Sequence, residues 1–157
     1  MKFNKISREA WESSSGFTSY YDDIKLPKRA TAGSAGYDFY LPYDIYLAAG
    51  ESLVIYTGIN CKLDPNKVLM VYPRSGLGFK FKTRLSNTVG VIDSDYINSD
   101  NEGHIMIKLC NEGTNPLALD AGQAFAQGII SSFYVVDEEN TDNMIKRNGG
   151  LGSTSNE

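Results

Sequence analysis

The sequence has few of the side chains on which several classes of protein depend. Its 157 residues include two cysteines and one histidine. Cys61 and Cys110 are far apart and form no CxxC motif, so neither a disulfide framework nor a cysteine zinc site is expected. His104 is the single candidate base for a Ser/His/Asp or Cys/His enzyme, and it lies in a strand-like run, which disfavours such chemistry. We therefore expect a reduced, cytoplasmic protein without zinc.

Long apolar runs are also missing. The apolar stretches extend over only a few residues, and no apolar segment follows the basic residues at the N-terminus, so neither a membrane span nor an export signal is predicted. Nineteen acidic residues against fifteen basic ones give a net charge of −4, which disfavours a nucleic-acid partner. A small anionic ligand remains compatible with this charge, because a few cations or a metal ion can reverse the field locally.

The residues that are abundant favour one all-β domain. Hydrophobic residues make up 41% of the chain and charged residues 22%, as in ordinary globular proteins, and the length suits one core. Short apolar runs alternate with turn signals. The expected strands are 37–41, 53–57, 68–72, 104–110 and 124–135, with a β-bulge at Gly128. Many short strands between turns favour a sandwich, a jelly roll or a barrel.

Two segments lie outside this β domain of residues 25–136. Residues 1–24 are polar and contain Trp11; we expect a short helix or a flexible extension there, without an assignable role. Residues 137–157 are polar and rich in glycine, which predicts a flexible C-terminal arm.

Two stretches in the first half of the chain carry candidate ligand groups. ATAGSAGYDFY (30–40) brings Asp38 into a strand between aromatic residues, where a carboxylate must be solvated, paired or close to a metal. In VYPRSGLGFKFK (71–82), a strand ends at Pro73 and Arg74, Ser75 and Gly76 follow. A guanidinium, a hydroxyl and an unhindered amide suit the oxygens of a polyphosphate. A basic β-turn is an equally good interpretation.

Three further stretches lie downstream. NTVGVIDSDYIN (87–98) ends an apolar run with Asp93 and Tyr96, a candidate base for a water and an aromatic that can pack on a ring; a calcium loop there would lack the EF-hand spacing. GQAFAQ (122–127) places Gln127 in an apolar strand, where an amide ordinarily satisfies backbone groups. KRNGGLGSTS (146–155) is either a flexible tail or a phosphate-binding loop.

In this order, the five stretches resemble the motif series of the trimeric dUTP pyrophosphatase (dUTPase) family. The motifs would be AGYDFY, PRSGLGFK, NTVGVIDSDY, GQAFAQ and GGLGST, and PRSG followed by NTVGVIDSDY is the most specific part. The resemblance covers residues from about 26 to 154. It implies a jelly-roll-like β-barrel subunit and a homotrimer whose active sites are shared between chains. It also implies Mg²⁺-dependent hydrolysis of dUTP to dUMP and pyrophosphate.

The resemblance further implies roles for individual residues. Asp93 would hold the water that attacks the α-phosphorus, Tyr96 would pack on the deoxyribose and exclude a 2′-hydroxyl, and Asp38 would contact Mg²⁺ through water. The other implied substrate contacts are Arg74, Ser75, Gly76, Asn87, Val91, Gln127, Lys146, Arg147, Leu151, Ser153 and Thr154. The C-terminal arm would close over nucleotide bound at a neighbouring subunit.

The chain departs from that family pattern in three places. The fifth motif commonly has an arginine before its Gly-Gly pair, and this chain offers both Lys146 and Arg147, so which cation would serve the γ-phosphate stays open. Leu151 replaces the usual aromatic residue and removes π-stacking on uracil. The pattern DYxG is stretched to DYINSDNEG, ending at Gly103, which predicts a longer hairpin tip.

Two other functions are alternatives to dUTP hydrolysis. A dCTP deaminase of the same superfamily needs a glutamate-centred water at C4 of the base, and no glutamate stands in the corresponding apolar strands. A nucleotide-binding regulatory protein of the same fold would bind nucleotide without turnover. The intact set of Asp93, Tyr96, Arg74, Ser75 and Gln127 favours catalysis.

Overall fold

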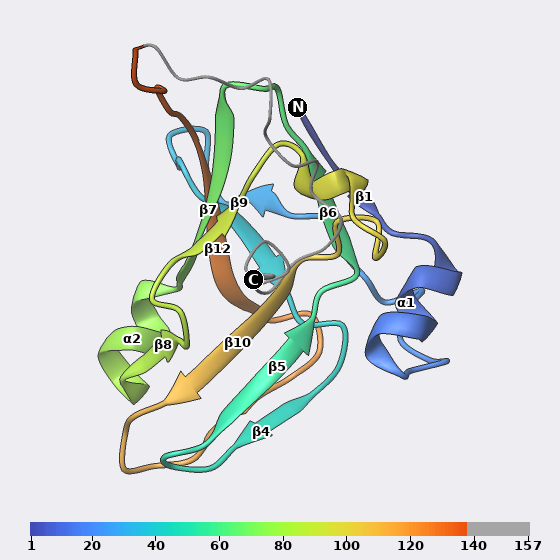
Figure 1. Cartoon of the computed structure of the whole chain (residues 1–157). Coiled ribbons are helices and arrows are strands. Elements are labelled where there is room, and N and C mark those ends of the chain that lie inside the picture. The colour runs from blue at the N-terminus through green and yellow to red at the C-terminus, as the bar shows by residue number, and fades with distance from the viewer. Residues whose placement is uncertain (138–157) are drawn as a thin grey trace, which may run out of the picture.

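The fold consists mainly of short antiparallel strands. A computed structural model describes residues 1–137 of the chain (Figure 1). Its strands are β1 (Lys2–Lys5), β2 (Lys28–Arg29), β3 (Tyr37–Tyr40), β4 (Ile45–Leu47), β5 (Ser52–Tyr56), β6 (Ile59–Lys62), β7 (Lys67–Pro73), β8 (Thr83–Leu85), β9 (Gly90–Ile92), β10 (Met106–Asn111), β11 (Leu117–Leu119) and β12 (Ala124–Ser132). The helices are α1 (Arg8–Ser15), α2 (Ser75–Phe81) and the 3₁₀ helix η1 (Tyr96–Asn98). The all-β prediction is confirmed.

A five-stranded and a three-stranded sheet contribute to the core together with the two-stranded pairs β1-β6 and β11-β4 and their connections. The strand orders of the two larger sheets are β2-β3-β12-β7-β9 and β5-β10-β8. Successive side chains of a strand point to opposite faces, and in β7 Leu69 and Val71 are buried whereas Met70 and Tyr72 are half-buried. Buried side chains from both sheets form one cluster, which includes Phe39, Phe125, Ile55 and Leu109.

The five expected strands occur as β3, β5, β7, β10 and β12, with bounds that differ by one to three residues. The expected β-bulge at Gly128 is wrong, because the register of β12 against β3 shifts between Ala124 and Ala126. Gly128 has a packing role instead: a Cβ atom there would lie 2.7 Å from Leu69 Cδ1 and 3.0 Å from Phe39 Cε2. Glycine therefore allows the side chains of neighbouring strands to close over β12.

Residues 1–24 are packed into the same core as the strands. β1 pairs antiparallel with β6, and Ile6, Trp11 and Ile24 are buried. Helix α1 begins after Ser7, whose side chain accepts from the Ala10 N–H, and ends at Gly16 in the left-handed conformation. The short helix expected here is present. Its burial was not foreseen, because the eight residues REAWESSS offer only one large apolar side chain.

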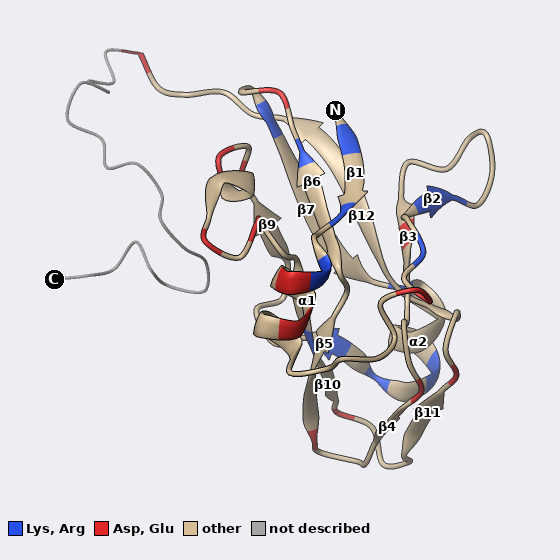
Figure 2. Cartoon of the chain, turned by 90° about the vertical axis from the view of Figure 1, so that its right-hand side faces the viewer, with Lys and Arg blue, Asp and Glu red and all other residues tan. Residues whose placement is uncertain are grey.

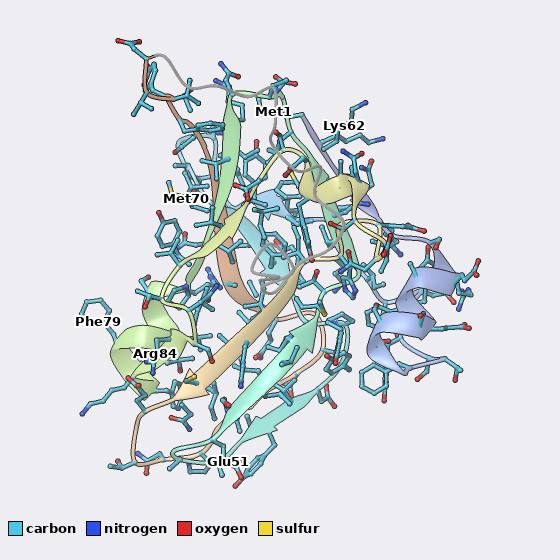
Figure 3. All side chains as sticks on the ribbon, viewed as in Figure 1. Met1, Glu51, Lys62, Met70, Phe79 and Arg84 are labelled. Atoms are coloured by element: carbon cyan, nitrogen blue, oxygen red, sulfur yellow. The ribbon has the colours of Figure 1, made fainter. Side chains whose placement is uncertain are left out.

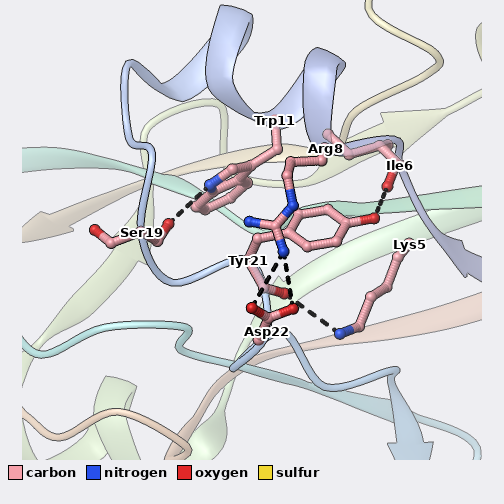
Figure 4. A network of polar contacts seen from close by, with 7 residues as sticks. All are labelled: Lys5, Ile6, Arg8, Trp11, Ser19, Tyr21 and Asp22. Atoms are coloured by element: carbon pink, nitrogen blue, oxygen red, sulfur yellow. Dashed lines mark hydrogen bonds and ion pairs between the residues drawn. The ribbon is translucent and has the colours of Figure 1, made fainter.

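Polar contacts close this N-terminal segment on itself (Figure 4). The Arg8 guanidinium donates to both carboxylate oxygens of Asp22 at 3.0 and 3.1 Å and lies 4.4 Å from the centre of the Tyr21 ring. The Trp11 indole N–H donates to the Ser19 carbonyl at 3.0 Å. Since Trp11 is fully buried, this bond satisfies its polar group inside the core.

Charged residues are distributed unevenly over the elements. Figure 2 shows basic residues on α2 and β2 and acidic residues on α1 and in the loop beside β9. That loop includes Asp93, Asp95, Asp100 and Glu102. Within residues 1–137, no helix combines the length and the apolar character needed to cross a bilayer.

Candidate active site

The five-stranded sheet places Asp38 and Gln127 opposite each other. Asp38 of β3 is the register partner of Gln127 of β12, and directly opposed residues of an antiparallel pair share one face. Both side chains are half-buried. The Gln127 amide donates to the Pro73 carbonyl at 3.3 Å, so this side chain also satisfies a backbone group. Segments that are far apart in the sequence thus meet through strand pairing.

Arg74 joins this pair from the end of β7. Its Nε lies 3.3 Å from Asp38 Oδ1, and the side chains are 43% and 13% exposed, respectively. The guanidinium stabilises a carboxylate that has lost most of its water. Because arginine carries five N–H donors, Arg74 can hold Asp38 and still bind phosphate oxygens. Burial raises the pKa of Tyr40, and the nearby Asp38 carboxylate raises it further.

A hollow of about 320 Å³ opens beside these three side chains. Its lining residues are Ala30, Ser34, Ala35, Gly36, Asp38, Arg74, Ser75, Gln127 and Ile129. Glycine at position 36 allows the Gln127 side chain to lie close to the backbone, since a Cβ atom on residue 36 would lie 2.6 Å from Gln127 Oε1. The glycine of the AGYDFY stretch therefore makes room for the amide of the GQAFAQ stretch.

Arg74, Ser75 and Gly76 do not form a β-turn. Arg74 is the N-cap of helix α2, which begins at Ser75, and its carbonyl accepts from the N–H groups of Leu77 and Gly78 at 3.1 Å each. The helix was missed because seven residues with two glycines give little helical signal. The alternative of a basic turn is therefore wrong.

A second hollow, of about 500 Å³, lies next to α2. Arg74, Ser75 and Gly76 line it together with Lys80. Lys80 belongs to the PRSGLGFK stretch but was not among the predicted site residues. Arg74 and Ser75 line both hollows, so the two hollows adjoin and the same guanidinium and hydroxyl could contact an extended anion.

A different, apolar cavity of about 210 Å³ lies between β7, β8, β9 and β10. Its lining residues are Val54, Val71, Leu85, Ser86, Asn87, Gly90, Ile92, Ile105, Met106, Ile107 and Lys108. Asn87 supplies an amide at an otherwise apolar wall. Such a cavity, with a few polar groups at fixed positions, suits a planar heterocycle.

Val91 lies in the same hairpin, but its side chain does not line that cavity. It is 58% exposed and pairs with Met70, so it belongs to the outer face of the sheet. Any contact from Val91 to a ligand in the cavity would have to come from its backbone.

Asp93 and Tyr96 follow β9 in a compact loop. The Tyr96 N–H donates to the Asp93 carbonyl at 3.2 Å. Tyr96 is 7% exposed, and its hydroxyl donates to the His104 carbonyl at 2.9 Å. Asp93 is half-buried. The loop therefore fixes the aromatic residue within the fold and keeps the acid near the surface.

The polar hollows and the apolar cavity lie on opposite sides of β7. In the sheet order, β12 is one neighbour of β7 and β9 is the other. The hollow beside Asp38 and the cavity beside Asn87 share no lining residue. Within residues 1–137 of one chain, the predicted phosphate and base contacts therefore line separate hollows. The predicted site residues Lys146, Arg147, Leu151, Ser153 and Thr154 lie outside the described residues.

Cys61 and His104 do not provide a nucleophile and its base. Burial raises the pKa of the Cys61 thiol to about 11, so the reactive thiolate is scarce at neutral pH. Burial lowers the pKa of His104 to about 4, and both ring nitrogens have hydrogen-bond partners in the fold. A Cys61 nucleophile and a His104 base are thus disfavoured by their burial.

The described part of the chain offers no preformed metal centre built from His, Cys, Asp and Glu side chains alone. No group of three His, Cys, Asp or Glu side chains that could hold a metal ion is found among residues 1–137. Asp38, with the Ser75 hydroxyl and the Gln127 amide in the same hollow, fits a Mg²⁺ ion that takes most of its ligands from water and substrate phosphates.

An antiparallel β fold with a cationic hollow and a separate apolar cavity defines a protein suited to a ligand with an anionic part and a planar part. A protein-family model described as dUTPase matches residues 22–155. The chain belongs to the dUTPase family.

Curated relatives support this assignment. A deoxyuridine 5′-triphosphate nucleotidohydrolase of Lactococcus lactis subsp. lactis (strain IL1403) is 38% identical over 132 residues, which cover 83% of this chain and 88% of that protein. A protein of the same name from Shewanella sediminis (strain HAW-EB3) is 39% identical over 135 residues, which cover 81% and 84%.

Solved structures show the same fold. The crystal structure of dUTPase from Streptococcus mutans aligns with a TM-score of 0.71 at 33% identity, covering 87% of this chain and 99% of that chain. A mutant dUTPase of Staphylococcus bacteriophage 80alpha with dUpNHpp aligns with a TM-score of 0.67 at 16% identity, covering 91% and 96%; this likeness concerns the fold alone. The jelly-roll-like β fold implied by the motif series is confirmed.

Proposed function

We propose that this protein hydrolyses dUTP to dUMP and pyrophosphate. The observation that carries the proposal is the meeting of Asp38, Arg74 and Gln127, from three separate stretches of the family's motif series, around one polar hollow. Membership of the dUTPase family and the names of the relatives support it. The acidic chain places cationic groups where a triphosphate would bind, which favours an anionic substrate.

The active site would be completed by association of three chains. The polar hollow and the apolar cavity lie on opposite sides of β7, so one copy would supply phosphate contacts and another the base contacts. An apolar outer surface is available for association: Val91 is 58% exposed, and Met70 and Ile129 are half-buried and paired in the same sheet. Burying such a surface between copies would stabilise a homotrimer.

The chain that follows β12 would extend to a neighbouring copy. Its first part is strongly apolar and exposed, with Tyr134 at 94% and Val136 at 75%. Lys146, Arg147, Leu151, Ser153 and Thr154 would then close on the nucleotide, with the cations and hydroxyls on the phosphates and Leu151 over the base. Burial of the apolar part against a second copy would hold the arm in reach of the substrate.

Asp93 would orient the attacking water. Its carboxylate would accept a hydrogen bond from the water and align the water oxygen with the α-phosphorus. The new bond forms between that oxygen and the α-phosphorus, and the bond from the α-phosphorus to the bridging oxygen breaks, so pyrophosphate leaves. The proton that the water loses would pass to the Asp93 carboxylate and from there to solvent. Donors from Arg74, Ser75, Gly76 and Gln127 would stabilise the charge on the phosphate oxygens during this exchange.

Asp38 is the residue that would hold Mg²⁺, through water. When bound, the ion would supply positive charge that neutralises the triphosphate oxygens. Selectivity for base and sugar would come from the hairpin and the loop after it. Asn87 and the backbone as far as Val91 would bind the uracil edge. Tyr96 would pack on the deoxyribose without space for a 2′-hydroxyl.

A comparison of substrates tests the proposal. Pyrophosphate release would be measured from dUTP, dCTP and UTP with Mg²⁺, and we expect rapid release from dUTP only. Deamination of dCTP would indicate the deaminase alternative. Tight dUTP binding without hydrolysis would indicate a regulatory nucleotide-binding protein. Either result would refute the proposed reaction.

The role of Asp93 has its own test. Asp93→Asn should retain dUTP binding and lower turnover by ~10²-fold or more, the scale for loss of a positioned acid–base group. Asp100→Asn, at an exposed position of the same loop, is the matched control and should turn over dUTP normally. Wild-type turnover by Asp93→Asn would remove this residue from the mechanism.

A further inference from the structure

We propose that the N-terminal segment, residues 1–24, positions the loop that carries Tyr96 and thereby sets the preference for deoxyribose over ribose. The segment would act through contacts of Ser7 and Ser14 with Glu102 and His104. For its kinetic consequence this inference rests on the proposed function. The contacts themselves belong to the fold and can be tested separately.

The first contact joins residues 95 positions apart. The Ser7 N–H donates to Glu102 Oε2 at 2.8 Å, and the Ser7 hydroxyl donates to Glu102 Oε1 at 2.6 Å. Ser7 is also the N-cap of α1. Two hydrogen bonds to one carboxylate fix both the position and the orientation of Glu102 relative to the start of the helix.

The second contact is buried. His104 Nε2 accepts from the Gly58 N–H at 2.9 Å, so the ring proton of the neutral imidazole lies on Nδ1. Nδ1 then donates to the Ser14 hydroxyl at 2.8 Å, and that hydroxyl donates to the Ala10 carbonyl at 2.6 Å. The indole of Trp11 lies 6.1 Å from the imidazole, centroid to centroid. Helix α1 thus contacts the His104 ring through Ser14 and Trp11.

Tyr96 is attached to the same residues. Its hydroxyl donates to the His104 carbonyl at 2.9 Å and accepts from Asn101 Nδ2 at 3.1 Å. Asn60 Nδ2 donates to the Glu102 carbonyl at 2.9 Å. His104, which Ser14 of α1 contacts, is therefore also bonded to the Tyr96 hydroxyl. Glu102, which Ser7 holds, lies between the two residues that bond to Tyr96, Asn101 and His104.

Backbone strain in the loop needs this support. Glu102 has a φ of +57°, a left-handed conformation that is unfavourable for a residue other than glycine. Gly103 has a φ of +69°, and a Cβ atom there would lie 2.6 Å from Ile97 Cα and 2.9 Å from the Tyr96 carbonyl oxygen. The loop folds closely over the backbone of Tyr96, and an unsupported Glu102 would favour a relaxed loop.

Substrate preference should respond more than the chemical step does. A displaced Tyr96 ring would admit a 2′-hydroxyl. Any accompanying shift of Asp93, whose carbonyl accepts from the Tyr96 N–H, would lower kcat for both substrates alike. Loss of the support should therefore raise kcat/KM for UTP relative to dUTP. A segment that served only overall stability would lower both values together and leave their ratio unchanged.

Ser7→Asp separates positioning from capping. Aspartate remains a good N-cap, but its carboxylate would face the Glu102 carboxylate and repel it. Glu102→Gln in the same chain should restore the contact, because its amide can donate to the new carboxylate. Arg8→Ala is the matched control: it removes the ion pair with Asp22 from the same segment without touching the loop.

Two measurements on the 157-residue chain test whether the N-terminal segment positions the loop. The ratio of kcat/KM for dUTP to that for UTP should fall by roughly 2- to 30-fold in Ser7→Asp, the range for coupling between packed neighbours, and recover in Ser7→Asp/Glu102→Gln. Amide hydrogen exchange of residues 96–104 should accelerate in Ser7→Asp only. Arg8→Ala should change neither quantity.

The outcomes separate the two proposals. If the wild-type protein hydrolyses dUTP but Ser7→Asp retains both the ratio and the exchange rate, the positioning role is overturned and the proposed function stands. If the wild-type protein fails to hydrolyse dUTP, the proposed function and the selectivity claim are refuted. Hydrogen exchange then still reports whether the N-terminal segment restrains the loop.

Discussion

Gly36 and Gln127 approach each other so closely that the smallest side chain would separate them. A Cβ atom on Gly36 would lie 2.6 Å from Gln127 Oε1, although the two residues are far apart in the sequence. Gln127 in turn donates to the Pro73 carbonyl. The glycine thus determines where the amide lies relative to Asp38 and Arg74.

Gly36→Ala should therefore lower dUTP hydrolysis without unfolding the protein. The methyl group would displace the end of the Gln127 side chain, and misplacement of one donor costs roughly 10²-fold in rate. Gly33→Ala is the matched control, because a Cβ atom there has no neighbour within 4 Å. Steady-state kinetics and circular dichroism of both variants would check this; equal activity in the two variants would contradict it.

Stability should depend on His104 in a defined pH range. Burial lowers the pKa of His104 from its ordinary value of 6.5 to about 4, so the unfolded chain binds the proton more tightly. The stabilising contribution of the neutral ring is complete above pH 6.5 and declines as pH falls from 6.5 towards 4. The total is about 3 kcal/mol.

Urea denaturation at pH values between 7.5 and 4 would measure this contribution. His104→Gln removes the titrating ring while keeping a group that can accept from Gly58 and donate to Ser14. The free energy of unfolding of this variant should fall less steeply with pH than that of the wild-type protein. Parallel curves would assign the acid sensitivity to other groups.

Trp11→Ala should destabilise the protein by about 3–5 kcal/mol, the usual cost of truncating a fully buried aromatic side chain. Trp11 is 0% exposed, whereas Phe79 on α2 is 93% exposed and points away from the body of the molecule (Figure 3). Phe79→Ala should change stability by less than ~0.5 kcal/mol. Thermal unfolding followed by circular dichroism at one protein concentration would compare the two; similar losses would contradict the buried position of Trp11.

Removal of residues 146–157 should lower kcat/KM for dUTP by roughly 10²-fold, because the cations and hydroxyls of this stretch would bind the phosphates. Assembly should be unaffected, which sedimentation can verify. Removal of residues 155–157 leaves the motif intact and serves as the control.

Leu151→Phe should lower the KM for dUTP, since an aromatic ring would restore stacking on uracil.

The strands that the sequence predicted are those with clear local patterns. β10 alternates buried side chains with half-buried or exposed ones, and the middle of β7 alternates buried with half-buried ones. This period of two is visible in the sequence. Strands of three residues, such as β4, β8 and β9, are too short to show a period. Helix α1 was foreseen only as one option, because its stability depends on burial of Trp11 against distant residues.

The candidate site likewise combines residues that the sequence predicted with residues that only the fold revealed. Asp38, Arg74 and Gln127 were chosen from the sequence because of their residue types and order along the chain. Lys80 and the support from Ser7 were not found, since no local pattern links Ser7 to Glu102 or Lys80 to the hollow. Both depend on which surfaces meet after the chain folds.

The amino-acid sequence by itself determined the β class and the principal strands, because these follow from short-range periodicity. It also indicated candidate side chains for a polyphosphate, through residue chemistry and the order of the motifs. Only the tertiary structure decided that Asp38 faces Gln127, that Ser7 holds Glu102, and that the apolar cavity beside Asn87 and the polar hollow beside Asp38 lie on opposite sides of β7. These relationships depend on pairing and packing between residues tens of positions apart, and the free energy of that packing is a property of the whole fold.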